Sequence, residues 1–266
     1  MRLLIIVIYS EAPEYEDMLK LQRSYLNRFE NVSSFFVTHR EHQMNLIDIK
    51  DDFIYVKGKE EYLQITHKTI RAFEYALKNV EFDYAIRTNI STVINIPELQ
   101  KYCSTLPKHH VYTSGCMLTL DALNEPFGIV DTSLFGTVYA SGTSIILSKD
   151  LVQRLVQFQR FIRYDVIDDV AIGHFISKYA SNSYYDRLAK WTIVTDHFHF
   201  DKSTVFYRNR SSTDRLVDAK HMKEIIHILY AFEKEGFTLS NWSDDWWTLY
   251  LCIAFGTLVV SIITAK

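Results

Sequence analysis

The sequence predicts an α/β sandwich built around a mostly parallel central sheet. Segments of strand-like and helix-like pattern alternate from residue 2 to residue 233, and this alternation is typical of a sheet covered by helices. The first segment, residues 2–8, is a continuous apolar run, as expected for a strand buried on both faces. With 48% hydrophobic and 23% charged residues, the 266-residue chain can form one large domain.

The expected elements follow one another in a regular order. Residues 13–29 and 60–79 carry apolar side chains at helical spacing. Pro97 is expected to begin a short helix, because proline is favoured at a first helical position. Further strands are expected at 32–38, 45–49, 53–56, 83–88, 92–96, 110–116, 137–148, 191–195 and 204–208, and further helices at 149–161, 168–180 and 213–233. No linker or repeat divides residues 1–240, which we interpret as one domain.

Charge and cysteine content exclude two classes of protein. The net charge is −3 and no basic run is present, so we expect no binding to nucleic acid. The three cysteines, Cys103, Cys116 and Cys252, lack the spacing of a disulfide framework, which favours a reducing compartment.

The C-terminal segment 246–265 contains no charged residue. As a helix its residues would span about 30 Å, the thickness of the hydrocarbon core of a bilayer. Trp242, Trp246 and Trp247 lie at its upstream end, as aromatic residues do at membrane interfaces. We interpret the segment as a single-pass membrane anchor formed by a C-terminal hydrophobic helix; the alternative is a terminal helix or strand buried in the domain.

The stretch 86-IRTNISTVIN-95 ends a predicted strand with polar residues, Arg87, Thr88, Asn89 and Ser91. Unpartnered polar groups are costly inside a core. Ligands of parallel sheets bind outside the carboxyl ends of the strands. We therefore expect these side chains to face a cleft.

Four segments occur in the order of a known family. The segments 62-YLQITHKTIRAFEYALKN-79 and 83-DYAIRTNISTVIN-95 are similar to the family's Tyr-x-Asn-Leu-Thr-x-Lys-Thr and Tyr-x-x-Lys-Thr-Asp-Asp-Asp-x-x-x-x-Asn. The segments 139-YASGTSIILS-148 and 168-DDVAIG-173 are similar to its Tyr-x-Ser-Gly-x-x-Tyr-x-Leu-Ser and Glu-Asp-Val-x-x-Gly. In these segments the chain resembles glycosyltransferases of the β-1,3-galactosyltransferase and Fringe type.

The resemblance implies a GT-A fold, the three-layer sandwich of nucleotide-diphospho-sugar transferases. It further implies an inverting transferase that moves a hexosyl group from a nucleotide sugar, most simply a UDP-sugar, to a hydroxyl of a glycan or glycoconjugate acceptor. The alternative is a catalytically inactive, membrane-tethered module that binds a nucleotide or sugar. A third alternative is a soluble enzyme whose hydrophobic tail belongs to its core.

The chain departs from the family at the metal-binding triplet. In the family this Asp-Asp-Asp holds a divalent cation, usually manganese, whereas this chain has Asn89, Ile90 and Ser91. Neither Asn89 nor Ser91 is charged, and a hard cation prefers several charged or carbonyl oxygens. We therefore expect Mn²⁺ to be bound weakly or not at all, with Asn89, Ser91 and Thr88 contacting the donor directly. The alternative is a pair of turn residues that close two strands.

His197 and His199 are the remaining candidate metal ligands. They share one face of an extended segment, in a region where the family often has a histidine that completes the metal site. Two histidines without a carboxylate make an incomplete metal site, and one of them is alternatively a core histidine.

Cationic side chains must stabilise the leaving diphosphate if no metal does so. Arg208 and Arg210 would project from one face of a strand, and arginine suits bidentate contact with phosphate. Lys68 and Arg87 are further candidates near the strand ends. The alternative is that these charges are solvated at the surface.

Asp168 and Asp169 are the predicted catalytic residues. Inverting transfer needs a general base for the acceptor hydroxyl, and the resemblance gives this role to the second acid, Asp169. The alternative is that both carboxylates only cap the helix that begins near residue 168. Ser141 and Gly142 are expected to form the floor beneath the sugar, because glycine allows close backbone approach.

We expect the catalytic domain to lie in the cytosol, on the membrane to which the C-terminal helix anchors it. The triplet Asn89-Ile-Ser91 is itself an N-glycosylation sequon inside the predicted site. Glycosylation there would block the site, which favours a cytosolic location.

Overall fold

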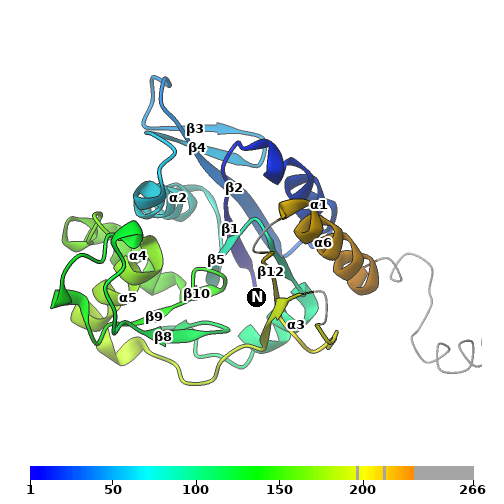
Figure 1. The fold of residues 1–266 in the computed structure, drawn as a ribbon. Coiled ribbons are helices and arrows are strands. Elements are labelled where there is room, and N and C mark those ends of the chain that lie inside the picture. Colours follow the sequence, from blue (N-terminus) through cyan, green and yellow to red (C-terminus); the bar gives the residue numbers. More distant parts are fainter. Residues whose placement is uncertain (196–197, 212–213, 231–266) are drawn as a thin grey trace, which may run out of the picture. The chain divides into compact units, whose positions relative to one another are not determined.

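The structure, a computed structural model, describes residues 1–195, 198–211 and 214–230. Within them, seven strands form a sheet in the order β3-β4-β2-β1-β5-β10-β7 (Figure 1). Its strands are Leu3–Ile8 (β1), Val32–Arg40 (β2), Ile47–Lys50 (β3), Phe53–Lys57 (β4), Tyr84–Asn89 (β5), Tyr112–Thr113 (β7) and Ile145–Ser148 (β10).

This sheet is mixed, so the expectation of a mostly parallel sheet holds for four neighbouring strands and fails for the pairings outside them. The four strands β4, β2, β1 and β5 are parallel to one another. The outer pairings of β3 with β4, β10 with β5 and β7 with β10 are antiparallel. Parallel neighbours need a long crossover, whereas antiparallel ones do not. The alternation of strands and helices shows where crossovers occur, but it does not show the direction of strands added without one.

Short strands and six helices complete the described chain. Residues Thr92–Ile94 (β6), Trp191–Val194 (β11) and Phe206–Asn209 (β12) form a second sheet, and Met117–Thr119 (β8) pairs with Val138–Ala140 (β9). The helices are Glu16–Leu26 (α1), Ile65–Asn79 (α2), Ile96–Cys103 (α3), Lys149–Gln157 (α4), Asp168–Tyr179 (α5) and Arg215–Tyr230 (α6). The predicted helices are therefore present, with ends that shift by a few residues.

The strand expected at 137–148 is divided in two. A turn separates β9 from β10, and in it the Ser144 amide donates to the Ser141 carbonyl at 3.0 Å. The serines, Gly142 and Thr143 in this stretch favour a turn over a continuous strand. This turn brings Ser141 and Gly142 beside the end of β5.

Helices cover both faces of the large sheet, which makes three layers. Figure 1 shows α2, α4 and α5 on one side of β1 and β5, with α1 on the other. Every residue of β1 is buried, as its continuous apolar run predicts. Leu4, Ile6 and Ile8 pack into the core that α2 and α5 share, around Phe73 and Phe175.

The register of the central strands sets the position of the polar motif. Asn89, the last residue of β5, is paired with Ile8 at the carboxyl end of β1. Arg87 lies between Ile6 on β1 and Ile145 on β10. The motif therefore lies at the end of the central strands, as the sequence predicts.

The predicted C-terminal anchor lies outside the described residues, as do the boundary at residue 240 and Cys252. Residues Met1–Ile225 form one compact unit. Among the helices that are described, none is both long enough and apolar enough to cross a membrane. The anchor and the cytosolic location stay predictions.

Candidate active site

A buried ion pair connects the polar motif to the acidic pair. Arg87 Nε lies 2.7 Å from Asp168 Oδ2, and Arg87 Nη2 lies 2.8 Å from Asp168 Oδ1. The two side chains are only 3% and 1% exposed. Thr69 on α2 also donates to Asp168 Oδ2, at 2.8 Å. Because its oxygens are engaged by three donors, Asp168 is suited to hold the first turn of α5 and not to accept a proton.

Asp169 is the carboxylate that this arrangement leaves available to accept a proton. Its Oδ1 accepts from the Val170 amide at 2.8 Å and its Oδ2 from the Gly142 amide at 3.2 Å. Burial and the Asp168 charge raise the pKa of Asp169 to about 6, against the opposing charge of Arg87. A carboxylate with a pKa near 6 is ionised at neutral pH and more basic than an ordinary aspartate.

Gly142 lies between the two charged groups, and its backbone contacts both. Its carbonyl accepts from Arg87 Nη1, while its amide contacts Asp169. A Cβ atom at this position would lie 2.7 Å from Arg87 Nη1. Glycine permits this close approach. That Ser141 and Gly142 form a floor beneath the sugar stays a prediction. The neighbouring Ser141 hydroxyl lies 2.9 Å from that of Thr143.

The polar residues after β5 are mostly satisfied by protein groups. Arg87, Thr88 and Ser91 are buried, at 2%, 0% and 0% exposure, and only Asn89 is partly exposed. Asn89 Oδ1 accepts from Arg87 Nη1 at 2.9 Å, and Thr88 Oγ1 donates to the Thr143 carbonyl at 2.7 Å. The expectation that all four side chains face a cleft is therefore wrong, because hydrogen bonds within the fold satisfy most of them.

Arg208 reaches the same turn from the second sheet. Its Nη1 donates to Ser91 Oγ, and it makes no ion pair with any carboxylate of the described residues. Burial and the charges of Arg215 and Arg210 lower the pKa of Arg208 to about 10, against the opposing charge of Asp218. A half-buried guanidinium among other arginines is electrostatically unsatisfied, so an anion would stabilise it.

The other predicted cations have different surroundings. Arg210 follows the end of β12 and is exposed. Lys68 is 1% exposed, pairs with Glu60 and donates to the Tyr9 carbonyl at 2.9 Å. The long lysine stem carries this ammonium inward to the end of β1, so Lys68 supports that strand end and does not itself face open space.

The described residues do not fit a tightly held Mn²⁺. Asn89 Oδ1 and Ser91 Oγ each accept a hydrogen bond from a guanidinium, which places positive charge where the cation would have to bind. No group of three or more His, Cys, Asp and Glu side chains in the described ranges is arranged to hold a metal. His199 is exposed and lines a surface hollow with Lys202, and His197 lies outside the described residues.

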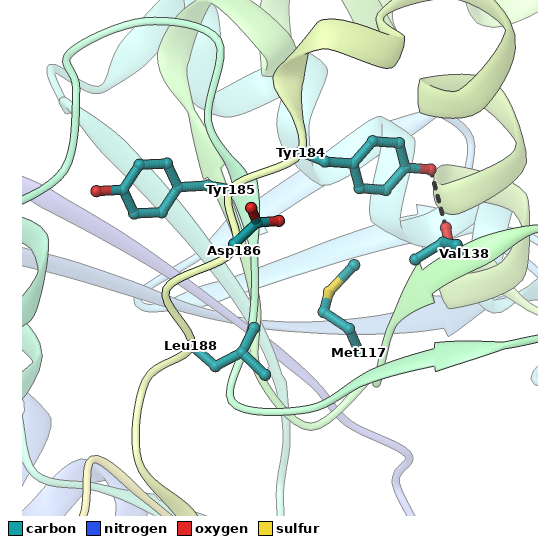
Figure 2. Close-up of a pocket in the computed structure, with 6 residues that line it drawn as sticks. All are labelled: Met117, Val138, Tyr184, Tyr185, Asp186 and Leu188. Atoms are coloured by element: carbon teal, nitrogen blue, oxygen red, sulfur yellow. Dashed lines mark hydrogen bonds between the residues drawn. The ribbon is translucent and has the colours of Figure 1, made fainter.

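A cavity of about 370 Å³ lies beside the small sheet of β8 and β9 (Figure 2). In Figure 2 the Tyr184 ring points toward Val138, and Tyr184 Oη donates to the Val138 carbonyl at 3.0 Å. The cavity is lined by Met117, Val138, Tyr184, Tyr185, Asp186 and Leu188. None of these is a predicted site residue, so the cavity does not mark the carboxylate site.

Comparison with known protein families identifies the chain. The profile of the family described as Galactosyltransferase matches residues 37–184, more than half of the chain, including Arg87, Gly142 and Asp169. The chain belongs to the galactosyltransferase family. It is a glycosyltransferase, and the resemblance seen in its motifs is confirmed.

A solved structure is also similar to this galactosyltransferase-family chain. It is a glycosyltransferase involved in the glycosylation of the major capsid of PBCV-1, with 12% sequence identity and a TM-score of 0.46. The similarity covers 84% of this chain and 100% of that one. None of the curated proteins compared with the chain matches it.

Two residues of the site, Thr66 and Thr69, belong to a family motif, but the sequence indicated no role for them. Thr66 donates to the Val166 carbonyl at 2.8 Å and Thr69 donates to Asp168, so α2 holds the segment that precedes Asp169. Their spacing of three residues puts both hydroxyls on one helix face, which is a signal that could have been used. No pattern in the sequence indicated that Glu60 belongs to the site, where it pairs with Lys68.

His39 lies behind Lys68 and shares Glu60 with it. The His39 amide donates to Glu60 Oε2 at 2.9 Å, and the ring stacks on His67 with centroids 5.9 Å apart. Neither ring nitrogen of His39 has a hydrogen-bond partner among the described residues. Burial and the charges of Lys68 and His67 lower the pKa of His39 to about 3. The folded protein therefore holds a neutral histidine.

We expect this histidine to make folding sensitive to acid. The unfolded chain protonates His39 below its ordinary pKa of 6.5, whereas the folded chain does so only near 3. Stability from this residue is fully present above pH 6.5 and is lost as the pH falls toward 3. At 1.36 kcal/mol per pKa unit, about 2 kcal/mol is lost between pH 6.5 and 5. Urea unfolding of wild type and His39→Leu at both pH values measures this difference, and equal losses in the two proteins would contradict it.

Proposed function

We propose that this family member is an inverting hexosyltransferase that uses a UDP-sugar donor and a hydroxyl acceptor of a glycan or glycoconjugate, without a tightly bound divalent cation. The observation that carries the proposal is Asp169, an available carboxylate with a raised pKa next to a turn to which Arg87 and Arg208 donate hydrogen bonds. A base and a cationic anion site are the two groups that such a transfer needs.

Asp169 acts as the general base. Its carboxylate accepts the proton of the acceptor hydroxyl while the hydroxyl oxygen forms a bond to the anomeric carbon. The bond from this carbon to the phosphate oxygen breaks on the opposite face, and its electron pair leaves with UDP. Asp168 and Arg87 take no proton in this step; they hold Asp169 and Gly142 in place.

Arg208 supplies the positive charge that a divalent cation would supply in a metal-dependent glycosyltransferase. The departing diphosphate gains negative charge as the bond breaks, and a positioned cation stabilises that charge. Arg208 has no carboxylate partner among the described residues, so its charge is available for an anion. Exposed Arg210 lies near enough to lower the pKa of Arg208 and adds to the positive potential.

The test is turnover of UDP-sugars with and without EDTA, in wild type and in Arg208→Ala. We expect turnover to survive EDTA, and we expect Arg208→Ala to lower kcat by roughly 10²–10³, the usual cost of one positioned charge-stabilising donor. Arg208→Lys keeps the charge and should retain part of the rate. Arg2→Ala is the matched control, because Arg2 is an exposed arginine that pairs with Glu81 at the amino end of β1.

Two results would reject this mechanism. Loss of turnover in EDTA with recovery on addition of Mn²⁺ would show that a metal is required. An Arg208→Ala variant that turns over like Arg2→Ala would remove Arg208 from the site. UDP binding without turnover of any UDP-sugar would instead favour the inactive binding module.

A further inference from the structure

Two aromatic rings from distant parts of the chain form an exposed pair. Tyr62 precedes α2 and Phe127 lies between β8 and β9, yet their rings stack with centroids 5.4 Å apart and an interplanar angle of 28°. Tyr62 is 50% exposed and Phe127 is 36% exposed. A stacked pair that is only partly covered leaves apolar ring surface open to its surroundings.

The pair is fixed beside the catalytic segment. The Ile167 amide, just before Asp168, donates to the Phe127 carbonyl at 3.0 Å. Gly128 follows with φ of +75°, and a Cβ atom there would lie 2.0 Å from the Asp165 carbonyl oxygen. The loop carrying Phe127 is therefore pressed closely against residues 165–167.

Tyr62 lies in the segment that leads into α2, which holds the residues before the same carboxylates. It lies four residues before Thr66, whose hydroxyl holds the Val166 carbonyl at 2.8 Å. Burial raises the pKa of the Tyr62 hydroxyl, and the Asp169 charge is the next largest cause of the increase. The stacked rings are therefore held close to residues 165–167, which directly precede the acidic pair that contains the proposed base.

We propose that the Tyr62–Phe127 pair is the binding platform for a hexopyranose ring of the acceptor, so that the acceptor is a sugar and not a protein side chain. A pyranose ring presents a face of C–H groups that packs on an aromatic ring, while its hydroxyls project from the rim. Stacked on this pair, the sugar would direct a rim hydroxyl toward Asp169. A serine or threonine side chain has no such face. The inference rests on the proposed function and specifies its acceptor.

The test compares Tyr62→Ala and Tyr62→Phe with wild type. The acceptors are the methyl pyranosides of glucose, galactose and mannose and a serine-containing peptide, each with the UDP-sugar that the enzyme hydrolyses fastest. We expect transfer to at least one pyranoside and none to the peptide. Tyr62→Ala should raise the KM for the pyranoside at least 10-fold more than it changes the KM for the donor, whereas Tyr62→Phe should remain within about threefold of wild type because it keeps the stacking face.

Tyr179→Ala is the matched control. Tyr179 is 46% exposed and its ring lies 5.3 Å from that of Phe161, so it belongs to a similar surface pair at the far end of α5. This variant should leave both KM values unchanged. An equal rise in the acceptor KM of Tyr179→Ala would show that the loss of any surface aromatic pair has this effect, and it would overturn the proposal.

Two further measurements separate this proposal from the proposed function. Hydrolysis of the UDP-sugar without acceptor tests the proposed function alone. Saturation-transfer NMR with the same methyl pyranosides tests the platform even in a protein without turnover, and the signal should fall in Tyr62→Ala. Absence of a signal for all three sugars in wild type, an unchanged signal in Tyr62→Ala, or efficient transfer to the peptide would overturn the platform.

Discussion

Replacing Asp169 with asparagine is expected to lower kcat for glycosyl transfer by about 10³, within the range that general bases contribute. The amide keeps the shape of the side chain and one oxygen acceptor, which can serve either the Val170 or the Gly142 amide. The fold and the donor site should therefore persist with the loss of one hydrogen bond. It cannot take a proton from the acceptor hydroxyl. Steady-state kinetics with a saturating UDP-sugar, together with UDP affinity by calorimetry, measure the two effects separately.

The pH dependence should identify the same group. Because burial raises the pKa of Asp169 to about 6, its carboxylate is protonated and inactive below that pH. We expect kcat/KM for the acceptor to fall about tenfold per pH unit below 6 and to be flat just above it. The residual activity of Asp169→Asn should lack this acidic limb. A limb that persists in the variant, or a variant with full activity, would assign the base to another residue.

Arg87→Met is expected to have the largest effect on stability, with a loss of about 3–5 kcal/mol in the free energy of unfolding, the usual cost of removing one partner of a buried ion pair. The change leaves the Asp168 carboxylate buried at 1% exposure without its cation. It also leaves the Gly142 carbonyl and the Asn89 side-chain oxygen without the Arg87 hydrogen bond. Urea unfolding followed by circular dichroism measures the loss.

The double variant Arg87→Met/Asp168→Leu provides the control. It removes both charges, so no unpaired carboxylate remains in the core, and we expect it to recover about 1–2 kcal/mol relative to the single variant. Thr69 still loses its acceptor, which prevents full recovery. A double variant less stable than Arg87→Met would show that the charge left behind is not the main cost.

The candidate site was predictable where local motifs carry it. The end of β5 near Asn89 and the start of α5 at Asp168 were each expected from short patterns and occur where expected, whereas the turn at Ser141 and Gly142 replaces part of an expected continuous strand. The partners of these groups were not predictable. Arg87 was expected to contact phosphate, yet it forms an ion pair with Asp168, 81 positions away in the sequence.

Exposure was the other property that local patterns did not show. Thr88 and Ser91 were expected at a cleft and are buried, because protein groups satisfy their hydrogen bonds. Tyr62 belongs to a family motif, but its stacking on Phe127 was not expected, since 65 positions separate the two residues. Such contacts depend on how loops fold over the carboxyl ends of strands, which no periodicity describes.

The sequence by itself determined the order of strands and helices, the family, and the absence of the acidic triplet, because each depends on residues close together in the chain. Only the tertiary structure decided the direction of the outer strands, the pairing of Arg87 with Asp168, and the availability of Asp169 and Arg208. The physical reason is that the charge state and availability of a side chain depend on burial and on neighbours brought together by folding. Two aspartates adjacent in the chain therefore have different roles: Asp168 is held by Arg87 and Thr69, and Asp169 is left as the base that we propose.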